Sequence, residues 1–531
     1  MTAKAHQDRS LSPQASAPFW RGSLQGSMRV VFLVTLLAGS MLTAGVVMAQ
    51  DNLIYQFKGL PSRDGAYPNA ELIADSHGNL YGTTEFGGST GTGGTACSAV
   101  GCGTVFEICA PTTVANGICT PSAAYVEHIL YSFQGCSGCG SSGDGATPAG
   151  GLIFDSVGNL YGTTGNGGNQ GCGSISGCGT VFVYCLSATG PWCASLSLGE
   201  HVLARMLTPA TDLRHPVDKL LIDSNFNLYG TTFDGGLASD CGAGYPNCGG
   251  VFLVCAPSSP SPLPCKGNPI STYNEIYFFT GAGNNDGGNP IGGLVMDSAG
   301  NLYGTTASGG TGAGSVSEPC QRFPESVLVS GCGTIFKLSL SGSTWTDTVL
   351  YNFAGYPNDG SYPLGTLVWD ATKKNLYGTT EFGPQGGGTV FEYSFSGAPT
   401  ILFEFANRWD GGNAYAGVSF DPTGKYLFGT TYSGGGGSLG TVYELQNLSG
   451  TWVNRSNYPL TGQALWSFEP YNLVHGQCLP SFNGTDGCSP FGGAIYQTET
   501  IKKKVTKRIF GTTYQGGIHG FGTVYGVTFL P

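Results

Sequence analysis

The sequence predicts an all-β protein, a seven-bladed β-propeller in which each blade is a sheet of four short strands. Three observations support this prediction. A phrase resembling Asn-Leu-Tyr-Gly-Thr-Thr occurs seven times, strand-forming residues alternate with glycine-rich turns, and no long segment has helical periodicity. Glycine accounts for 89 of the 531 residues and aromatic residues for 12%, so the chain is rich in both turn and strand formers.

Each copy contains four predicted strands, which we name a, b, c and d. In the first copy, strand a lies near Leu72, strand b at 79–84, strand c at 103–109 and strand d near Ile129. The Tyr-Gly-Thr-Thr or Phe-Gly-Thr-Thr of strand b stands at 81–84, 161–164, 229–232, 303–306, 377–380, 428–431 and 510–513. Strand c, with the pattern Gly-Thr-Val-Phe, starts at 103, 179, 249, 333, 388, 440 and 522. Radially packed four-stranded units are what a propeller requires.

The two ends of the repeat region predict how the ring closes. The segment 52–57 reads as a d strand with no other strand of its copy before it, and the sequence ends just after a strand c. We expect this N-terminal strand to complete the last blade and close the ring, because a linear array would leave the edge of that blade exposed. Strands d are expected near 53, 129, 202, 276, 349, 401 and 464.

Residues 1–49 read as a signal peptide with an N-terminal extension, and residues 50–531 as the propeller. Arg21 and Arg29 precede an apolar run over 30–47, and cleavage after Ala49 fits the small-residue rule. Met28 is an alternative start, and a transmembrane anchor is the alternative interpretation of the apolar run. We expect a secreted or periplasmic protein with no membrane span after cleavage and no C-terminal anchor.

Eighteen cysteines follow this leader and form nine pairs of close neighbours in the sequence. This pattern predicts a set of disulfides in an oxidising compartment. The simplest connectivity pairs nearest neighbours, although other connectivities stay open. These pairs are Cys97 with Cys102, Cys109 with Cys119, Cys136 with Cys139, Cys172 with Cys178, Cys185 with Cys193, Cys241 with Cys248, Cys255 with Cys265, Cys320 with Cys332 and Cys478 with Cys488.

The charge balance argues against nucleic acid as a partner. The formal net charge is -11, with only 22 lysines and arginines, whereas phosphate binding needs a concentrated basic surface. We interpret the one dense basic run, 502–504 with Lys507 and Arg508, as a solvated hairpin. We expect a monomer whose partner is an extracellular glycan or protein.

Two recurring aspartates are the candidates for chemistry. The aspartate after strand a (Asp75 in the first copy) is predicted to cap its tight turn. The second aspartate precedes a glycine in the d–a turn. It is either a turn residue or a ligand-face residue, with Ca²⁺ as an alternative ligand for its oxygens. This second set is Asp64, Asp144, Asp286, Asp359, Asp410 and Asp486.

The sequence shows no nucleophile elbow, metal-ligand spacing or phosphate loop, so we predict no catalytic, cofactor-binding or metal residues. The repeated phrase, continued as a Gly-Gly pair and Gly-Thr-Val-Phe-Glu-Leu, resembles the GloVer-type tandem repeat of secreted bacterial proteins with a choice of C-terminal anchors. This resemblance implies export and a propeller-like fold, and it implies no defined activity.

Three functions stay open from the sequence. The first is a non-catalytic binding or scaffold propeller that recognises a glycan or protein through the face carrying the d–a and b–c loops. The second is an extracellular polysaccharide-active enzyme or lyase with its site at the channel mouth, where Glu85 and Glu381 follow the threonine pairs. The third is a structural envelope or matrix protein.

Overall fold

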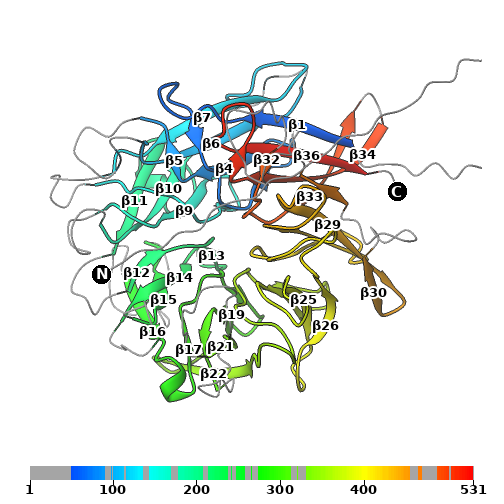
Figure 1. Ribbon diagram of the computed structural model, residues 1–531. Helices are drawn as coiled ribbons and strands as arrows, with labels where there is room; N and C mark the ends of the chain where they lie inside the picture. The colour runs from blue at the N-terminus through cyan, green and yellow to red at the C-terminus, as the bar shows by residue number, and fades with distance from the viewer. Residues whose placement is uncertain are drawn as a thin grey trace, which may run out of the picture. The chain divides into compact units, whose positions relative to one another are not determined.

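The computed structural model describes residues 50–89, 97, 100–112, 115, 117–135, 143–168, 177–206, 213–236, 241, 247–257, 265, 273–311, 320, 331–454, 465–468, 487–501 and 504–529, with a few gaps in side-chain detail. Within 47–531 these residues form seven antiparallel blades arranged as a β-propeller (Figure 1). The described part of the chain holds two short 3₁₀ turns, at Cys193–Ser195 and Ala282–Asn284. It contains no helix long and apolar enough to cross a membrane.

The first four blades follow the predicted strand order from a to d. Blade 1 has β3 (Ile73–Ala74), β4 (Leu80–Thr84), β6 (Thr104–Cys109) and β7 (Val126–Ser132). Blade 2 has β8 (Ile153–Phe154), β9 (Leu160–Thr164), β10 (Thr180–Cys185) and β11 (Gly199–Arg205). Blade 3 has β13 (Leu221–Ile222), β14 (Leu228–Gly235), β15 (Gly250–Val254) and β16 (Tyr273–Phe278). Blade 4 has β18 (Val295–Met296), β19 (Leu302–Thr306), β21 (Thr334–Ser341) and β22 (Thr344–Asn352).

The last three blades keep the same order with more variation in the outer strand. Blade 5 has β23 (Val368–Trp369), β24 (Leu376–Thr380), β25 (Thr389–Tyr393) and β26 (Thr400–Glu404). Blade 6 has β27 (Ser419–Phe420), β28 (Tyr426–Thr431) and β29 (Thr441–Leu448), flanked by β30 (Thr451–Asn454) and β31 (Trp466–Ser467). Blade 7 has β33 (Ile495–Ile501), β34 (Lys504–Thr513), β36 (Thr523–Phe529) and β1 (Gln50–Gln56).

Short strands in the d–a and b–c loops pair with one another and tie these loops together. Three two-stranded ladders do this in blades 1, 4 and 7, and β12 (Leu213–Pro216) joins β14 in blade 3. The ladders are β2 (Gly65–Ala66) with β5 (Phe86–Gly87), β17 (Gly287–Gly288) with β20 (Ser308–Gly309), and β32 (Gly487–Cys488) with β35 (Gln515–Gly516).

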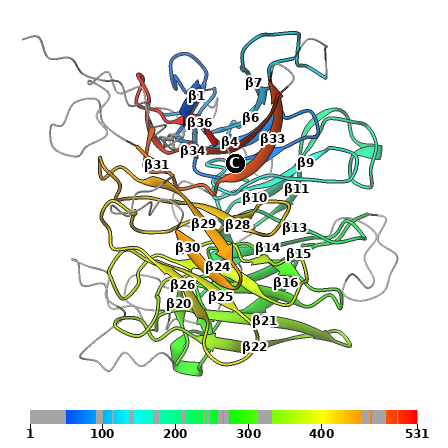
Figure 2. The same ribbon diagram turned by 90° about the vertical axis from the view of Figure 1, so that its right-hand side faces the viewer.

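The last blade combines both ends of the described chain. β1 pairs antiparallel with β36, from Gln50 opposite Thr528 to Gln56 opposite Thr523, and the two lie side by side in Figures 1 and 2. β1 therefore occupies the d position of a sheet whose other three strands come from residues 495–529.

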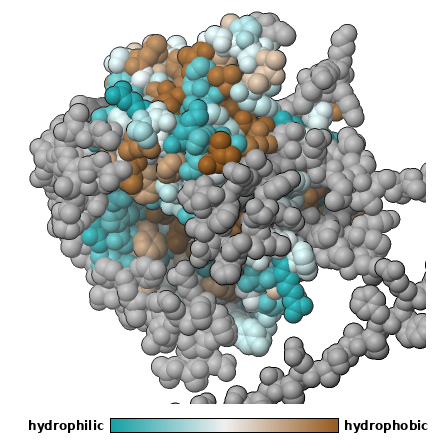
Figure 3. All heavy atoms as spheres, turned by 45° about the horizontal axis from the view of Figure 1, so that its top comes forward, coloured by the Kyte–Doolittle hydropathy of each residue, from teal (hydrophilic) through white to brown (hydrophobic). Residues whose placement is uncertain are grey.

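The core lies between neighbouring blades and is built by one repeated aromatic contact. The residue that follows strand d packs against the strand c aromatic of the next blade: the Phe133 and Phe182 ring centroids are 5.2 Å apart, and those of Phe57 and Phe106 are 5.1 Å apart. All four side chains are fully buried. On the face shown in Figure 3, hydrophobic residues instead occur in separate patches interrupted by hydrophilic ones.

The Tyr-Gly-Thr-Thr phrase persists because each position has a packing role. A Cβ on Gly82 would lie 2.6 Å from Phe106 Cζ, so the aromatic ring of strand c fits only over a glycine. Thr83 Oγ1 donates to the Gly150 carbonyl of the next blade (3.1 Å). Thr84 Oγ1 lies 2.7 Å from Thr104 Oγ1 within the blade. The threonine pair thus joins strands b and c and links neighbouring blades.

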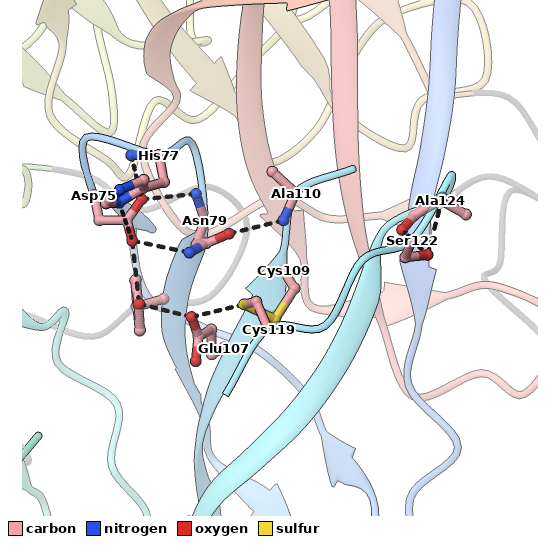
Figure 4. Close-up of a disulfide and its surroundings, with 10 residues drawn as sticks. Asp75, His77, Asn79, Glu107, Cys109, Ala110, Cys119, Ser122 and Ala124 are labelled. Atoms are coloured by element: carbon pink, nitrogen blue, oxygen red, sulfur yellow. Dashed lines mark hydrogen bonds and ion pairs between the residues drawn. A yellow bond between two sulfur atoms is a disulfide. The ribbon is translucent and has the colours of Figure 1, made fainter. Parts of the chain in front are cut away.

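The aspartate of the a–b turn caps that turn, as predicted. Asp75 Oδ1 accepts hydrogen bonds from the backbone N–H groups of His77 (2.8 Å) and Asn79 (2.9 Å), and Oδ2 accepts one from Asn79 Nδ2 (2.9 Å; Figure 4). Asn79 Oδ1 in turn accepts from the Ala110 N–H at the end of strand c. Equivalent bonds form around Asp155, Asp223 and Asp297.

The interpretation of Arg508 as part of a solvated hairpin is wrong. Its side chain is 2% exposed, Nη1 donates to the Tyr125 hydroxyl (2.8 Å), and the guanidinium carbon lies 4.7 Å from the centroid of the Phe510 ring. Arg508 occupies the position that Asn79 holds in the first copy, where side chains point into the fold. It therefore links blade 7 to blade 1, and only its neighbours remain candidates for a solvated hairpin.

Six of the nine predicted disulfides are present, which confirms nearest-neighbour pairing there. They are Cys97–Cys102, Cys109–Cys119, Cys185–Cys193, Cys241–Cys248, Cys255–Cys265 and Cys320–Cys332. The other three predicted pairs are not confirmed. Cys178 and Cys488 are disulfide-bonded, but their expected partners, Cys172 and Cys478, lie outside the described residues.

The remaining predicted pair, Cys136 with Cys139, lies entirely outside the described residues. Cys136 and Cys139 both fall in the segment 136–142, between the end of the strand d region of blade 1 and the d–a turn that holds Asp144. A disulfide between Cys136 and Cys139 therefore stays a prediction from their spacing.

Candidate binding site at the channel mouth

The predicted ligand-face aspartates lie in the d–a turns. Their carboxylates accept hydrogen bonds from groups of the turn and of strand d. Asp64 accepts from the Tyr55 hydroxyl (2.9 Å) and from the Lys58 and Gly65 N–H groups. Asp144, Asp286 and Asp359 likewise each accept from a strand d tyrosine, and Asp410 accepts from the Ala406 N–H. Asp64, Asp286 and Asp359 are buried. Asp486 lies outside the described residues, and ligand binding by this set stays a prediction.

The structure brings a different set of residues together at the central axis of the propeller, where all seven blades meet. A cavity of about 360 Å³ is lined by the residues that immediately precede strand a in all seven blades. Its wall is mainly apolar and is interrupted by a few polar side chains, which is the usual character of a ligand site. Lining residues are Ala70, Glu71, Ala149, Val217, Asp218, Lys219, Ile291, Leu364, Thr366, Tyr415 and Phe491.

One side of this cavity carries a charged cluster that spans several blades. Lys219 Nζ of blade 3 lies 2.5 Å from Glu71 Oε2 of blade 1. Asp218 accepts hydrogen bonds from the Gly293 N–H (2.6 Å) and from the Thr366 hydroxyl. Burial alone would lower the pKa of Lys219, but the charges of Glu71 and Asp218 outweigh it and raise that pKa. Lys219 therefore stays a cation inside the cavity.

Aromatic rings from blades 6, 7 and 1 form a continuous arc beside the cavity. Ring centroids are 5.0 Å apart for Tyr67–Tyr514, 5.3 Å for Tyr514–Phe491, 5.2 Å for Phe491–Tyr415 and 4.8 Å for Phe491–Tyr432. We call these five residues the aromatic arc. All are half-buried, so their rings combine packing with an accessible surface. Such rings are large, rigid contact surfaces for a ligand.

Two carboxylates accept hydrogen bonds from tyrosines of the aromatic arc. The Tyr514 hydroxyl donates to Glu85 Oε2 (3.0 Å) and the Tyr415 hydroxyl to Glu381 Oε1 (3.0 Å). Burial raises the pKa of Glu85, while the bond from Tyr514 lowers it less. The sequence had singled out both glutamates by their place after the threonine pairs, and the structure assembles them with the aromatic arc.

The d–a loops that surround the mouth share an uncommon backbone conformation. At the same position of each loop a non-glycine residue has φ between 51° and 58°, namely Tyr67, Thr147, His215, Asn289, Tyr362, Asn413 and Ser489. The N–H of Tyr67 donates to the Phe521 carbonyl, and its carbonyl accepts from the Glu85 N–H, so the strained residue fixes the loop between blades. In blade 3, His215 Nδ1 lies 2.7 Å from Asp234 Oδ1, and Arg214 Nη2 lies 3.3 Å from Asp234 Oδ2.

One further group in the described chain has metal-ligand chemistry. Glu107, Cys109 and Cys119 place ligand atoms within 4.8 Å of one another. The two sulfurs form a disulfide, which lies beside Glu107 (Figure 4). Glu107 Oε1 accepts a hydrogen bond from the Tyr81 hydroxyl (2.7 Å). Because a cysteine coordinates a metal as a thiolate, and both of these sulfurs are in a disulfide, this group does not fit a metal in the oxidised protein.

Neither the charged cluster nor the aromatic arc was predicted from the sequence. The signal was present at the position just before strand a, which is Glu71, Lys219 and Thr366 in blades 1, 3 and 5 but glycine in the other four. A Cβ on Gly151 would lie 3.4 Å from Lys219 Cβ, and one on Gly293 would lie 3.5 Å from Asp218 Oδ2, so these glycines leave space for the two side chains. Comparing the copies for departures from the repeat identifies the site better than the repeated residues do.

The repeated phrase and the blade arrangement are both typical of one family of repeat proteins. The Gloeobacter/Verrucomicrobia repeat matches residues 325–463, which hold β21 to β30, and the same phrase recurs in the copies outside that segment. The chain is a β-propeller that carries the Gloeobacter/Verrucomicrobia repeat. No curated protein matches this repeat propeller.

Solved structures that resemble this repeat propeller do so at low identity. A protein of unknown function from Dyadobacter fermentans is 11% identical, with a TM-score of 0.37, covering 76% of this chain and 96% of that one. The periplasmic gluconolactonase PpgL of Pseudomonas aeruginosa is 13% identical, with a TM-score of 0.37, covering 83% and 98%. A putative 6-phosphogluconolactonase from Bacteroides uniformis is 13% identical, with a TM-score of 0.38, covering 82% and 93%. These likenesses say nothing about activity.

Proposed function

We propose that the protein is an exported recognition module that binds a glycan at the channel mouth. The observation that carries the proposal is the cavity of about 360 Å³, whose wall combines Tyr415 and Phe491 with a polar set of Glu71, Asp218 and Lys219. Aromatic faces pack against the apolar faces of sugar rings, while carboxylates and an ammonium group bond to hydroxyls. The disulfides support an extracellular location, and the apolar run at 30–47 supports export.

A glycan and polysaccharide screen with purified, disulfide-oxidised protein tests this function, run with Ca²⁺ and with EDTA. We expect saturable binding that Phe491→Ala weakens at least tenfold. Phe395→Ala is the matched control, because Phe395 is exposed in the c–d connection of blade 5, where it stacks on Trp369. Loss of binding with EDTA alone would point to Ca²⁺ held by the mouth carboxylates. Binding that Phe395→Ala weakens and Phe491→Ala does not would overturn the assignment of the site.

The second candidate is a polysaccharide-active enzyme at the same mouth. It is favoured by Glu85, whose pKa is raised by burial as a general acid requires, and by the His215–Asp234 pair. Release of reducing ends or of unsaturated products during the same screen would identify turnover. In that case Glu85→Gln should abolish turnover while retaining binding. If no glycan binds, the remaining functions are protein recognition and an envelope or matrix role.

A further inference from the structure

The aromatic arc and its carboxylates carry information about the charge of the ligand. From them we infer that the glycan recognised at the mouth bears an ammonium group, as an amino sugar does. This inference rests on the proposed function, because it specifies the ligand of the same site. It follows from three properties of the mouth: accessible aromatic faces, a carboxylate without a cation, and a cavity that already holds one ammonium group.

The rings of the arc offer an environment that attracts cations. Tyr67, Tyr514 and Phe491 form a chain of contacts with centroid separations of 5.0 and 5.3 Å, and each ring is half-buried. The face of an aromatic ring carries negative potential, so an ammonium group within about 6 Å of the centroid is attracted. Several rings grouped together strengthen that attraction, whereas a neutral or anionic ligand gains only packing.

Glu85 supplies the negative charge that such a cation needs. Its Oε2 accepts the Tyr514 hydroxyl bond, and no cation in the described part of the chain forms an ion pair with it. A half-buried carboxylate without a cation is costly to keep ionised, in accord with the raised pKa of Glu85. A cationic ligand would offset this cost, while a neutral sugar would leave it in place.

The cavity shows how this fold accommodates an ammonium group. Lys219 Nζ lies beside Glu71, with side-chain exposures of 28% and 24%, and Lys219 lines the same cavity as Tyr415 and Phe491. Here an amine from one blade is neutralised by a carboxylate from another. At the mouth, Glu85 supplies the carboxylate and the arc supplies the aromatic rings, but no amine among the described residues pairs with Glu85. The ligand would provide that amine.

Two oligosaccharides of equal length test the inference: a glucosamine hexamer and its fully N-acetylated counterpart. Binding is measured by calorimetry at pH 5.5, with tetramethylammonium as a probe that carries the charge without the sugar. We expect the glucosamine hexamer to bind at least tenfold more tightly than the N-acetylated hexamer. Glu85→Gln should abolish that preference and tetramethylammonium binding together. Glu404→Gln, on the outer strand of blade 5, is the matched control and should change neither.

The outcomes separate this inference from the proposed function. Equal or tighter binding of the N-acetylated hexamer, lost in Phe491→Ala, would overturn the ammonium inference and leave glycan recognition standing. Tetramethylammonium binding that depends on Glu85, with no glycan bound, would support the cation site and reject the proposed function. Absence of binding by any probe would reject both. Thermal melting of each variant shows whether a lost signal reflects unfolding instead.

Discussion

Three junctions between blades each bring a second carboxyl group against a strand d tyrosine and its aspartate. At the first, the Tyr55 hydroxyl donates to Asp64 (2.9 Å) and lies 3.4 Å from Glu127 Oε2. Burial, reinforced by the charge of Asp64, raises the pKa of Glu127 to about 8, although the Tyr55 bond and Lys58 oppose the shift. Burial and a neighbouring aspartate likewise raise the pKa of Glu200, beside Asp144, to about 8 and the pKa of Asp347, beside Asp286, to about 7.

These shifts predict that the propeller loses stability as pH rises. An unfolded glutamate ionises near pH 4.5, whereas folded Glu127 keeps its proton until about pH 8, so the folded state binds more protons across that window. The stabilisation is complete below pH 4.5 and is lost as pH rises through 8. The free energy of unfolding should fall by about 1.4 kcal/mol per pH unit for each such group, with an upper limit of roughly 5 kcal/mol over the window.

Glu127→Gln isolates one of these groups, because the amide cannot ionise but keeps the size of the side chain. We expect its unfolding free energy, measured by urea denaturation from pH 5 to 8.5, to depend on pH less steeply than that of the unmodified protein, by about 1.4 kcal/mol per pH unit. The variant should match the unmodified protein near pH 5 and exceed it at pH 8.5. Glu404→Gln should leave the slope unchanged. An unchanged slope in Glu127→Gln would refute the reasoning.

Three further changes test the packing of the blades. Gly82→Ala should cost about 1–3 kcal/mol in thermal denaturation, because its Cβ would lie 2.6 Å from Phe106, whereas Gly165→Ala, with nothing nearer than 3.5 Å, should be near neutral. Lys219→Met should cost roughly 3 kcal/mol by urea denaturation, because Glu71 and Asp218 lose their cation; a neutral result would contradict the proposed ion-pair role. Phe57→Ala should cost as much as Phe133→Ala, about 3–5 kcal/mol, since each ring packs on the next blade. A much smaller cost for Phe57→Ala would show that blades 7 and 1 are less tightly packed.

The repeated features of the fold were predictable because the same physical constraint acts seven times. Strand b requires a glycine beneath the strand c aromatic ring, as at Gly82 and Phe106, and the a–b turn requires a side chain such as Asp75 to bind its N–H groups. Nearby cysteines in short loops pair with their neighbours for simple geometric reasons, and six pairs bear this out.

The candidate site was less predictable because it depends on contacts across blades. Lys219 and Glu71 are 148 residues apart in the sequence, and no local pattern indicates that they meet. Arg508 belongs to a basic run in the sequence, yet strand alternation and its place in the repeat bury it against Tyr125. The d–a aspartates recur regularly because each turn requires one to accept its hydrogen bonds. A residue that recurs in this way indicates a structural role more than a role in ligand specificity.

Hydrogen–deuterium exchange of the protein with and without a bound glycan locates the binding site on the propeller. We predict that ligand slows exchange in 65–71, 411–417, 489–493 and 511–516, the segments that carry Tyr67, Tyr415, Phe491 and Tyr514. Exchange should stay unchanged in the c–d connections on the opposite face, such as 394–399. Protection confined to those connections, with none around Phe491 and Tyr514, would show that the glycan binds elsewhere.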